Sequence, residues 1–335
     1  MIEVKNLVKR YGDHVAVDHL SFTVEEGQIY GFLGPNGAGK STTMNIITGY
    51  LGFNEGEVLI DGHDIVEEPE EAKQCIGYLP EMPPLYFDMT VREYLAFAAE
   101  LKKIPKDQKN EQIDKIMEMV KITDMENRLI KNLSKGYRQR VGLAQAVLGD
   151  PEIIILDEPT VGLDPKQIIE IREMIRNLGK KHTVILSSHI LSEVSAVCDY
   201  VMIINHGKLV ASDTPDNLSR IAVGSNTLEL TVKGQMGTVV SAVGMIPGIE
   251  DVKYKNSDEK DCVDIIIKTC TEVDIREKIF YKMADIQCPI LKMQSTSLSL
   301  EDVFLELTED DHQSVESEIS AASEEGGEDR DESNL

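Results

Sequence analysis

The sequence predicts an α/β protein with two domains: a mainly parallel sheet with intervening helices, and then a smaller α+β unit. Three observations support this prediction. At 335 residues the chain is longer than one compact core usually holds. Apolar runs typical of buried strands alternate with helical patterns over residues 1–220. After about residue 220 the composition changes and two strand-like runs follow each other directly.

The first domain, residues 1–220, takes its predicted strands from short apolar runs. These runs are Gln28–Leu33, Glu57–Ile60, Ile153–Leu156, Thr183–Ser187 and Tyr200–Ile204. Helical patterns such as Lys166–Leu178 separate several of them, which predicts a mainly parallel sheet. Between about residues 88 and 148 the strand-like runs stop, and Arg92–Leu101 and Gln112–Val120 have the apolar spacing of helices. We therefore expect a helical subdomain inserted in the α/β domain.

The second domain, residues 221–308, is predicted from six further elements. Its strand-like runs are Thr227–Val232, Ile249–Tyr254, Cys262–Lys268 and Ile290–Gln294, and its helical patterns lie near Val239–Val243 and Val273–Ala284. Their order, β-α-β-β-α-β, predicts a ferredoxin-like unit. A last helix is expected at Leu300–Leu307. Residues 309–335 have almost no apolar side chains, so we expect an acidic disordered tail.

Charge and cysteine content limit the classes of function. The net charge of −25, of which the tail contributes −10, argues against a nucleic-acid-binding protein, because such proteins bind phosphates through basic patches. No apolar run reaches the roughly 18 residues of a membrane-spanning helix, and we expect no secretory signal. The cysteines are odd in number and widely spaced. This pattern suits a reducing cytosol and predicts neither a disulfide framework nor a zinc site. They are Cys75, Cys198, Cys262, Cys270 and Cys288.

Residues 34–41 carry the clearest chemical signal. They read GPNGAGKS and match the pattern G-x-x-x-x-G-K-[ST] at each fixed position. Glycines allow backbone N–H groups to curl around phosphates, and the helix expected after the loop directs its positive end toward them. We expect Lys40 to reach the β- and γ-phosphates and the Ser41 hydroxyl to bind Mg²⁺. The predicted ATP site of this loop consists of Gly34, Pro35, Asn36, Gly37, Ala38, Gly39, Lys40, Ser41 and Thr42.

A second signal lies at the end of the run Ile153–Leu156, where Asp157 and Glu158 follow. Adjacent strand residues point in opposite directions, but the chain can turn both carboxylates toward one site where the strand ends. By itself this pattern is weak evidence for a nucleotide site. With the phosphate loop upstream, it becomes strong evidence. It predicts that Asp157 holds Mg²⁺, and that Glu158 orients and polarises the attacking water.

The stretch Leu133–Arg140 reads LSKGYRQR and precedes the carboxylate strand. Ser134 is a suitable N-cap for the helix expected after it. At this point the sequence resembles the ATP-binding subunits of ABC transporters, whose signature motif reads LSGGQ. Lys135 and Tyr137 depart from that motif, while Ser134 and Gly136, which face phosphate in the family, are kept. The resemblance implies that residues 1–220 form a P-loop ABC ATPase domain.

The same resemblance implies roles for four other residues. Asp164 stands where the family has its D-loop, and His189 stands where its switch histidine contacts the γ-phosphate. Tyr11 fits the aromatic residue that stacks on adenine. Glu81 replaces the glutamine that the family usually has in its Q-loop. Two roles are open for Glu81: a ligand of Mg²⁺, which we favour because a hard cation prefers carboxylate oxygen, and a side chain that faces the partner subunit.

The resemblance also implies how such a protein works. Two ATP-binding domains, as a homodimer or a heterodimer, meet head to tail, so that the ATP held by Lys40 of one faces Ser134 and Gly136 of the other. Hydrolysis opens the dimer, and the motion passes through the Q-loop to separate transmembrane permease subunits. The chain is then a peripheral subunit on the cytoplasmic face of the membrane. Candidate permease contacts, for which core packing is the alternative, are Phe87, Met89 and Tyr94.

Within the family the sequence looks most like the ATPases of bacterial ABC-2 type exporters, including gliding-motility and multidrug members. Ser299–Leu305 resembles the end of their C-terminal accessory domain, for which regulation, dimerisation and permease contact are all open roles.

The main alternative is a soluble ABC-type ATPase not coupled to transport, as in DNA repair or on the ribosome. It is disfavoured because no long coiled coil, zinc-binding cysteines or second ATPase domain is visible. A GTPase would need N-K-x-D, which is absent. A non-enzymatic regulator is opposed by the intact Lys40, Asp157, Glu158 and His189.

Overall fold

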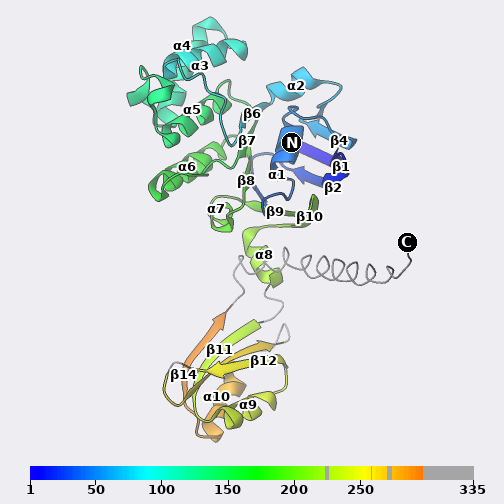
Figure 1. Cartoon of the computed structure of the whole chain (residues 1–335), viewed down its shortest axis with the longest axis vertical. Coiled ribbons are helices and arrows are strands. Elements are labelled where there is room, and N and C mark those ends of the chain that lie inside the picture. Colours follow the sequence, from blue (N-terminus) through cyan, green and yellow to red (C-terminus); the bar gives the residue numbers. More distant parts are fainter. Residues whose placement is uncertain (223–225, 258, 270–273, 297–335) are drawn as a thin grey trace, which may run out of the picture. The chain divides into compact units, whose positions relative to one another are not determined.

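The computed structural model describes residues 1–222, 226–257, 259–269 and 274–296, and Figure 1 shows the course of the chain. The chain divides into two compact units, residues 1–215 and residues from 216 onward. Each unit has its own sheets and its own hydrophobic core. The division falls inside the helix α8 (Pro215–Ala222), which also contains the domain boundary predicted at residue 220.

The first unit contains a six-stranded sheet made of buried apolar runs. Its strands are β3 (Ile29–Leu33), β6 (Ile76–Leu79), β7 (Ile153–Asp157), β8 (Thr183–Ser188), β9 (Tyr200–Asn205) and β10 (Lys208–Asp213). They lie in the order β10-β9-β3-β8-β7-β6, parallel except for the antiparallel pair of β9 and β10. Every residue of β3, β7 and β8 is buried, as expected for a parallel sheet covered on both faces.

A separate antiparallel sheet of the first unit corrects one prediction. It consists of β1 (Ile2–Tyr11), β2 (His14–Val24), β4 (Glu55–Ile60) and β5 (His63–Asp64), in the order β2-β1-β4-β5. The prediction that the run Glu57–Ile60 joins the parallel sheet is wrong, because β4 pairs antiparallel with β1. An apolar run this short has the same pattern in either kind of sheet, so the partner strand decides its place. The strands β1 and β2 are not among the predicted elements.

Helix α1 (Lys40–Ile47) contacts both sheets through β2 and β7. Its buried residues Met44 and Ile47 belong to one core together with Leu20 of β2 and Ile155 of β7. This packing holds the loop between β3 and α1 at the carboxyl ends of the parallel strands. Ligand sites of open α/β sheets form at that edge.

The helices between β6 and β7 form the inserted helical segment. They are α3 (Val91–Leu101), α4 (Lys106–Met119) and α5 (Lys135–Val147), and the predicted helices fall on α3 and α4. A capping box between Thr90 and Glu93 begins α3. Other helices of this unit are α2 (Pro69–Gln74), α6 (Pro165–Leu178) and α7 (Leu191–Ser195). Over the described part of the chain, no helix is both long and apolar enough to cross a membrane.

The second unit is built on an antiparallel sheet of four strands. Its elements are β11 (Asn226–Lys233), α9 (Met236–Gly244), β12 (Ile249–Asn256), β13 (Cys262–Thr269), α10 (Arg276–Asp285) and β14 (Ile290–Thr296). The sheet order is β12-β13-β11-β14, and Val243 and Ile279 of the two helices share a core with the strands. The predicted helix at 273–284 begins only at Arg276, whose N–H donates to Asp274. The helix predicted at 300–307 and the tail 309–335 lie outside the described residues.

Candidate functional site

The predicted phosphate loop joins β3 to α1, and its shape depends on glycine. Gly39 has a φ of +100°, and a Cβ there would lie 2.5 Å from the carbonyl oxygen of Ala16, so no larger residue fits. Lys40 begins α1, and its side chain curls back to donate hydrogen bonds to the carbonyl oxygens of Gly34 (2.8 Å) and Pro35 (3.1 Å). The loop therefore surrounds an ammonium group at the N-terminus of a helix, where phosphate oxygens bind well.

Lys40 is only 6% exposed, and this burial lowers the pKa of its ammonium group. The carboxylates of Glu158 and Asp157 oppose the shift. Glu158 Oε1 lies 3.9 Å from the lysine Nζ, which makes a long ion pair. The ammonium thus has one distant charged partner and two neutral carbonyl partners. Phosphate oxygens can replace these with shorter, charge-assisted hydrogen bonds.

The two predicted carboxylates lie at the carboxyl end of β7. Asp157 Oδ1 accepts hydrogen bonds from the hydroxyls of Ser41 (3.2 Å) and Ser187 (2.5 Å). Glu158 follows with a φ of +47°, a left-handed conformation that is uncommon for residues other than glycine. The Asp157 carboxylate meets Ser41 and the Glu158 carboxylate meets Lys40, so both are directed to the phosphate loop.

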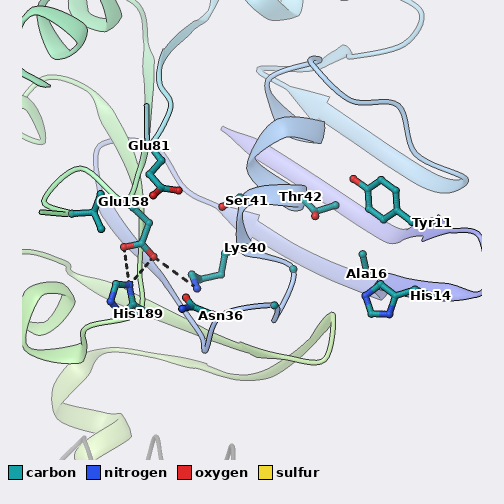
Figure 2. Close-up of a pocket in the computed structure, with 13 residues that line it drawn as sticks. Tyr11, His14, Ala16, Asn36, Lys40, Ser41, Thr42, Glu81, Glu158 and His189 are labelled. Atoms are coloured by element: carbon teal, nitrogen blue, oxygen red, sulfur yellow. Dashed lines mark hydrogen bonds and ion pairs between the residues drawn. The ribbon is translucent and has the colours of Figure 1, made fainter. Parts of the chain in front are cut away.

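His189 completes a group of three side chains with Glu158 and Lys40. Its Nδ1 lies 3.1 Å from Oε1 and 3.0 Å from Oε2 of Glu158. Figure 2 shows the three side chains pointing toward one another at one end of the pocket. His189 is partly exposed, whereas the Glu158 side chain is buried. A carboxylate held between an imidazole and an ammonium group suits a residue that polarises water.

Lys40, Glu158 and His189 line an open pocket with a volume of about 390 Å³. Ten of the predicted site residues line it: Tyr11, Asn36, Gly37, Gly39, Lys40, Ser41, Thr42, Glu81, Glu158 and His189. The other three that line it, His14, Ala16 and Val161, were missed by the sequence analysis as site residues. His14 and Ala16 come from β2, a strand without a recognisable motif.

Tyr11 and Glu81 lie at different sides of this pocket. Tyr11 ends β1, is half exposed and lies with His14 away from Glu158 (Figure 2). An exposed ring at the pocket edge suits stacking on a base. The Glu81 side chain points into the pocket in the same figure. Its carboxylate is thus available to a ligand of this pocket.

The signature residues lie outside the pocket and have partners elsewhere. Ser134 is the N-cap of α5, and its hydroxyl accepts a hydrogen bond from the N–H of Tyr137 (3.4 Å). A Cβ on Gly136 would clash with the Gln167 side chain of α6, so the two helices approach closely here. Lys135 extends toward Gly162, and Asp164 is the N-cap of α6.

The three candidate permease contacts differ in exposure. Tyr94 is buried at 3% exposure and its hydroxyl donates to Gln145, so it is a core residue. Phe87 is 48% exposed and lies under the guanidinium of Arg138, 5.1 Å from ring centre to Cζ. Met89 is half-buried. Of the three, Phe87 offers the most surface to another protein.

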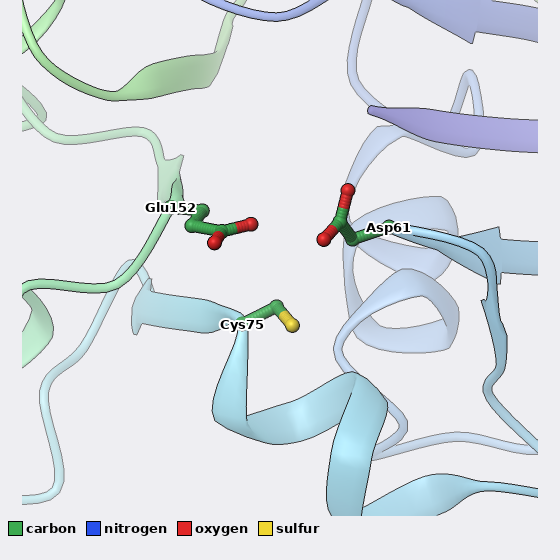
Figure 3. Close-up of side chains that lie close together, drawn as sticks. All are labelled: Asp61, Cys75 and Glu152. Atoms are coloured by element: carbon green, nitrogen blue, oxygen red, sulfur yellow. The ribbon is translucent and has the colours of Figure 1, made fainter.

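One other group of potential metal ligands lies away from the pocket. Asp61, Cys75 and Glu152 have ligand atoms within 4.8 Å of one another (Figure 3). A hydrogen bond with Asp61 and the charge of that carboxylate raise the pKa of Glu152. Burial and the two carboxylates raise the pKa of the Cys75 thiol. Both shifts favour the neutral forms of the Glu152 carboxyl and the Cys75 thiol. Cys75, Cys198, Cys262 and Cys288 are free thiols.

Comparison with known proteins assigns this site to a family. The family model described as "ABC transporter" matches residues 17–161. An ABC transporter ATP-binding protein of Bacillus subtilis (strain 168) is 35% identical over 319 residues, which cover 94% of this chain and 98% of that protein. The chain belongs to the ABC transporter ATP-binding family. This confirms the resemblance to ABC transporter ATP-binding subunits.

Two further relatives and two solved structures agree with this assignment. The bacitracin transport ATP-binding protein of Bacillus licheniformis is 35% identical and the linearmycin resistance ATP-binding protein of Bacillus subtilis (strain 168) is 31% identical. Each alignment covers 92% of this chain and at least 97% of the relative. The structure of an ATP-binding subunit of an ABC transporter aligns with a TM-score of 0.61 at 30% identity, over 66% of this chain and 92% of that one. A bacterial ABC transporter cassette solved as a dimer aligns with a TM-score of 0.59 at 25% identity, over 64% of this chain and 98% of that one.

These findings confirm the predicted P-loop ABC ATPase fold. Members of the family hydrolyse ATP to power transport, so this ABC ATPase is an ATP-binding and ATP-hydrolysing subunit of a transporter. The alternative of an ABC-type ATPase without a transport role finds no support among these relatives.

Proposed function

We propose that this ABC ATPase drives export through a separate transmembrane permease. The observation that carries the proposal is the full-length similarity to the bacitracin transport and linearmycin resistance ATP-binding proteins, which extends through the second unit. Both alignments include the second unit, and both relatives are named for the transport of an antibiotic or for resistance to one. The chain then acts at the cytoplasmic face of the membrane, held there by the permease. The proposed contact with the permease is Phe87 and the residues around it, in the segment that follows Glu81.

ATP occupies the pocket in this proposal, with its base on Tyr11 and its phosphates in the loop from Gly34 to Thr42. Lys40 gives up its carbonyl partners and binds the phosphate oxygens. The residues also fit Mg²⁺, because Ser41, Asp157 and Glu81 offer hydroxyl and carboxylate oxygen, the donors that this cation prefers. Bound there, the cation neutralises charge on the phosphates.

Glu158 and His189 carry out the hydrolytic step. The Glu158 carboxylate orients and polarises the attacking water, and its buried place between His189 and Lys40 holds it in position. His189 contacts the γ-phosphate and steadies the charge that develops there. The signature residues of the same chain take no part in this step.

A second ATP-binding subunit supplies the rest of the site in the proposed working state. The signature residues Ser134, Lys135, Gly136 and Tyr137 bind the partner's ATP, and the N-terminus of α5 directs its positive end toward that phosphate. Asp164 caps α6, the helix whose Gln167 lies against Gly136 of the signature. The solved dimer of a related cassette supports such a pair of subunits.

The second unit is proposed to be a ferredoxin-like accessory domain. Its elements follow the order β-α-β-β-α-β, and β11 and β13 form the centre of the sheet with β14 and β12 at the edges. We assign it residues 221–308 of the sequence, followed by a strongly acidic segment at 309–335.

Trapping the ATP-bound state tests the export assignment. Tagged Glu158→Gln is purified with ATP and Mg²⁺ from gently solubilised membranes of the native cell, and co-purifying proteins are identified by mass spectrometry. A polytopic membrane protein in stoichiometric amount is expected. In cells lacking this chain, sensitivity to bacitracin and linearmycin is compared with that of cells carrying the unaltered chain or Glu158→Gln. A trapped dimer with only soluble partners would contradict a transport role.

A further inference from the structure

Ser187, the next-to-last residue of β8, contacts the two acidic residues at the end of the neighbouring strand β7. It is fully buried, with 0% exposure. Its hydroxyl donates a hydrogen bond to Asp157 Oδ1 at 2.5 Å and accepts one from the backbone N–H of Glu158 at 2.9 Å. One hydroxyl therefore bridges the side chain of Asp157 and the backbone of Glu158.

The register of the parallel sheet makes this bridge possible. Asp157 and Ser187 are direct partners in the pair formed by β7 and β8. Both residues lie in the protein interior, since Asp157 is only 3% exposed. Hydrogen bonds in such an environment are stronger than in water, and the loss of one leaves a polar group that solvent does not reach.

The first effect of the bridge is on the direction of the Asp157 carboxylate. Oδ1 accepts from Ser187 and from Ser41, whose hydroxyl arrives from the start of α1. Two donors that come from different elements restrain the position of Oδ1. The carboxylate is therefore held in place before any cation arrives, which removes a reorganisation cost from binding.

The second effect is on the turn at Glu158. A φ of +47° is strained for a residue with a Cβ, and such strain persists only where surrounding contacts hold the backbone. The hydrogen bond from the Glu158 N–H to Ser187 is a contact of this kind. This backbone conformation directs the Glu158 carboxylate to His189 and Lys40.

We propose that Ser187 is a positioning residue for ATP hydrolysis, which fixes the Asp157 carboxylate and the Glu158 turn with a single hydroxyl. It does not touch ATP and acts through these two residues. The inference rests on the roles proposed above for Asp157 and Glu158.

Three variants separate positioning from structural support. Ser187→Ala removes the hydroxyl, and Ser187→Thr keeps it. Ser188→Ala is the matched control, because Ser188 is equally buried on the same strand but its hydroxyl contacts Glu193 and the Ile190 N–H instead. Thermal unfolding of each purified full-length protein measures how much of any effect is a loss of stability.

Steady-state kinetics then give the expected pattern. In Ser187→Ala, kcat falls about tenfold and the half-saturating Mg²⁺ concentration rises about fivefold, while KM for ATP stays within about twofold, because the phosphate loop is intact. Ser187→Thr restores both values. Ser188→Ala keeps the half-saturating Mg²⁺ concentration of the unaltered protein, whatever its stability. Unchanged kcat and unchanged Mg²⁺ dependence in a folded Ser187→Ala would overturn the proposal, as would equal Mg²⁺ effects in the two alanine variants.

A binding measurement without turnover provides the second test. In the Glu158→Gln background, ATP affinity is measured by calorimetry with Mg²⁺ and with a chelator. Ser187→Ala is expected to leave the affinity in chelator unchanged and to reduce the gain from Mg²⁺ about fivefold. An undiminished gain would contradict the positioning role. Failure of the proposed function looks different: the chain with native Ser187 would then show no gain from Mg²⁺, or Glu158→Gln would hydrolyse ATP at the native rate.

Discussion

The two parts of the proposed ATP site differ in how one chain presents them. The residues proposed for hydrolysis, Lys40, Glu158 and His189, converge within a single pocket, where Glu158 contacts both of the others. The signature residues Ser134 and Gly136 instead lie outside that pocket, where they cap α5 and contact α6. The first part is assembled within one chain, by the parallel sheet and the helix α1 that packs on it. In the proposed function, the second is a surface that binds phosphate only when another subunit brings it.

The largest effect is expected at the assembled part. Glu158→Gln keeps the size of the side chain but removes the carboxylate that polarises water, so kcat should fall about a thousandfold. ATP binding should remain, and an ATP-bound dimer should accumulate. Phosphate release and size-exclusion chromatography with ATP measure the two outcomes. Hydrolysis at the native rate would show that Glu158 is not the base.

The next effect is on nucleotide affinity. Lys40→Ala removes the buried ammonium group that the phosphate loop surrounds, and ATP should bind roughly a hundredfold more weakly. Calorimetric titration measures the affinity. Lys115→Ala, an exposed lysine of α4, is the control and should leave it unchanged. Equal ATP affinity in Lys40→Ala and the native protein would disprove the phosphate-loop assignment.

A charge placed in the signature distinguishes the two parts. Ser134→Asp retains an N-cap for α5 but adds a negative charge facing the partner's phosphate, so turnover should fall at least about tenfold while the monomer still binds ATP. Ser134→Asn caps the helix without the charge and should keep more activity. Thermal unfolding should show little difference between them. If Ser134→Asp and Ser134→Asn have the same turnover, the signature does not face phosphate.

The smallest effect concerns the carboxyl pair remote from both parts. Because Asp61 raises the pKa of Glu152 in the folded protein, the pair favours folding at low pH and this contribution is lost as pH rises through the folded pKa. Asp61→Asn should therefore raise the melting temperature slightly at pH 7, with a gain that disappears toward pH 4. Glu118→Gln, an exposed carboxylate of α4, is the control. A gain that grows as pH falls would contradict the raised pKa of Glu152 in the folded protein.

Much of the site was predictable because its motifs depend on neighbouring residues. The phosphate loop needs a glycine where φ is +100° and a lysine directly after it, and both requirements are visible in the order of residues. The carboxylates follow an apolar run that has to be a strand. Capping of α5 by Ser134 is also local, and the structure shows it.

Other parts were not predictable because they depend on which strands become neighbours. β4 was assigned to the parallel sheet, since its apolar pattern does not reveal that β1 is its partner. His14 and Ala16 reach the pocket only through the pairing of β2 with β1. Ser187 stands opposite Asp157 because β8 lies beside β7 in register. No spacing in the sequence expresses these relations.

The sequence by itself determined the chemistry of this protein: a loop shaped for phosphate, a lysine to bind it, and two carboxylates after a buried strand. These features follow from short-range backbone geometry and from the identity of the side chains. Only the tertiary structure decided how these groups are positioned relative to one another. It turned both carboxylates to the same loop, supplied Ser187 to hold them, and kept the signature away from its own pocket. These arrangements depend on contacts between residues far apart in the chain, and packing of the sheets and helices selects them.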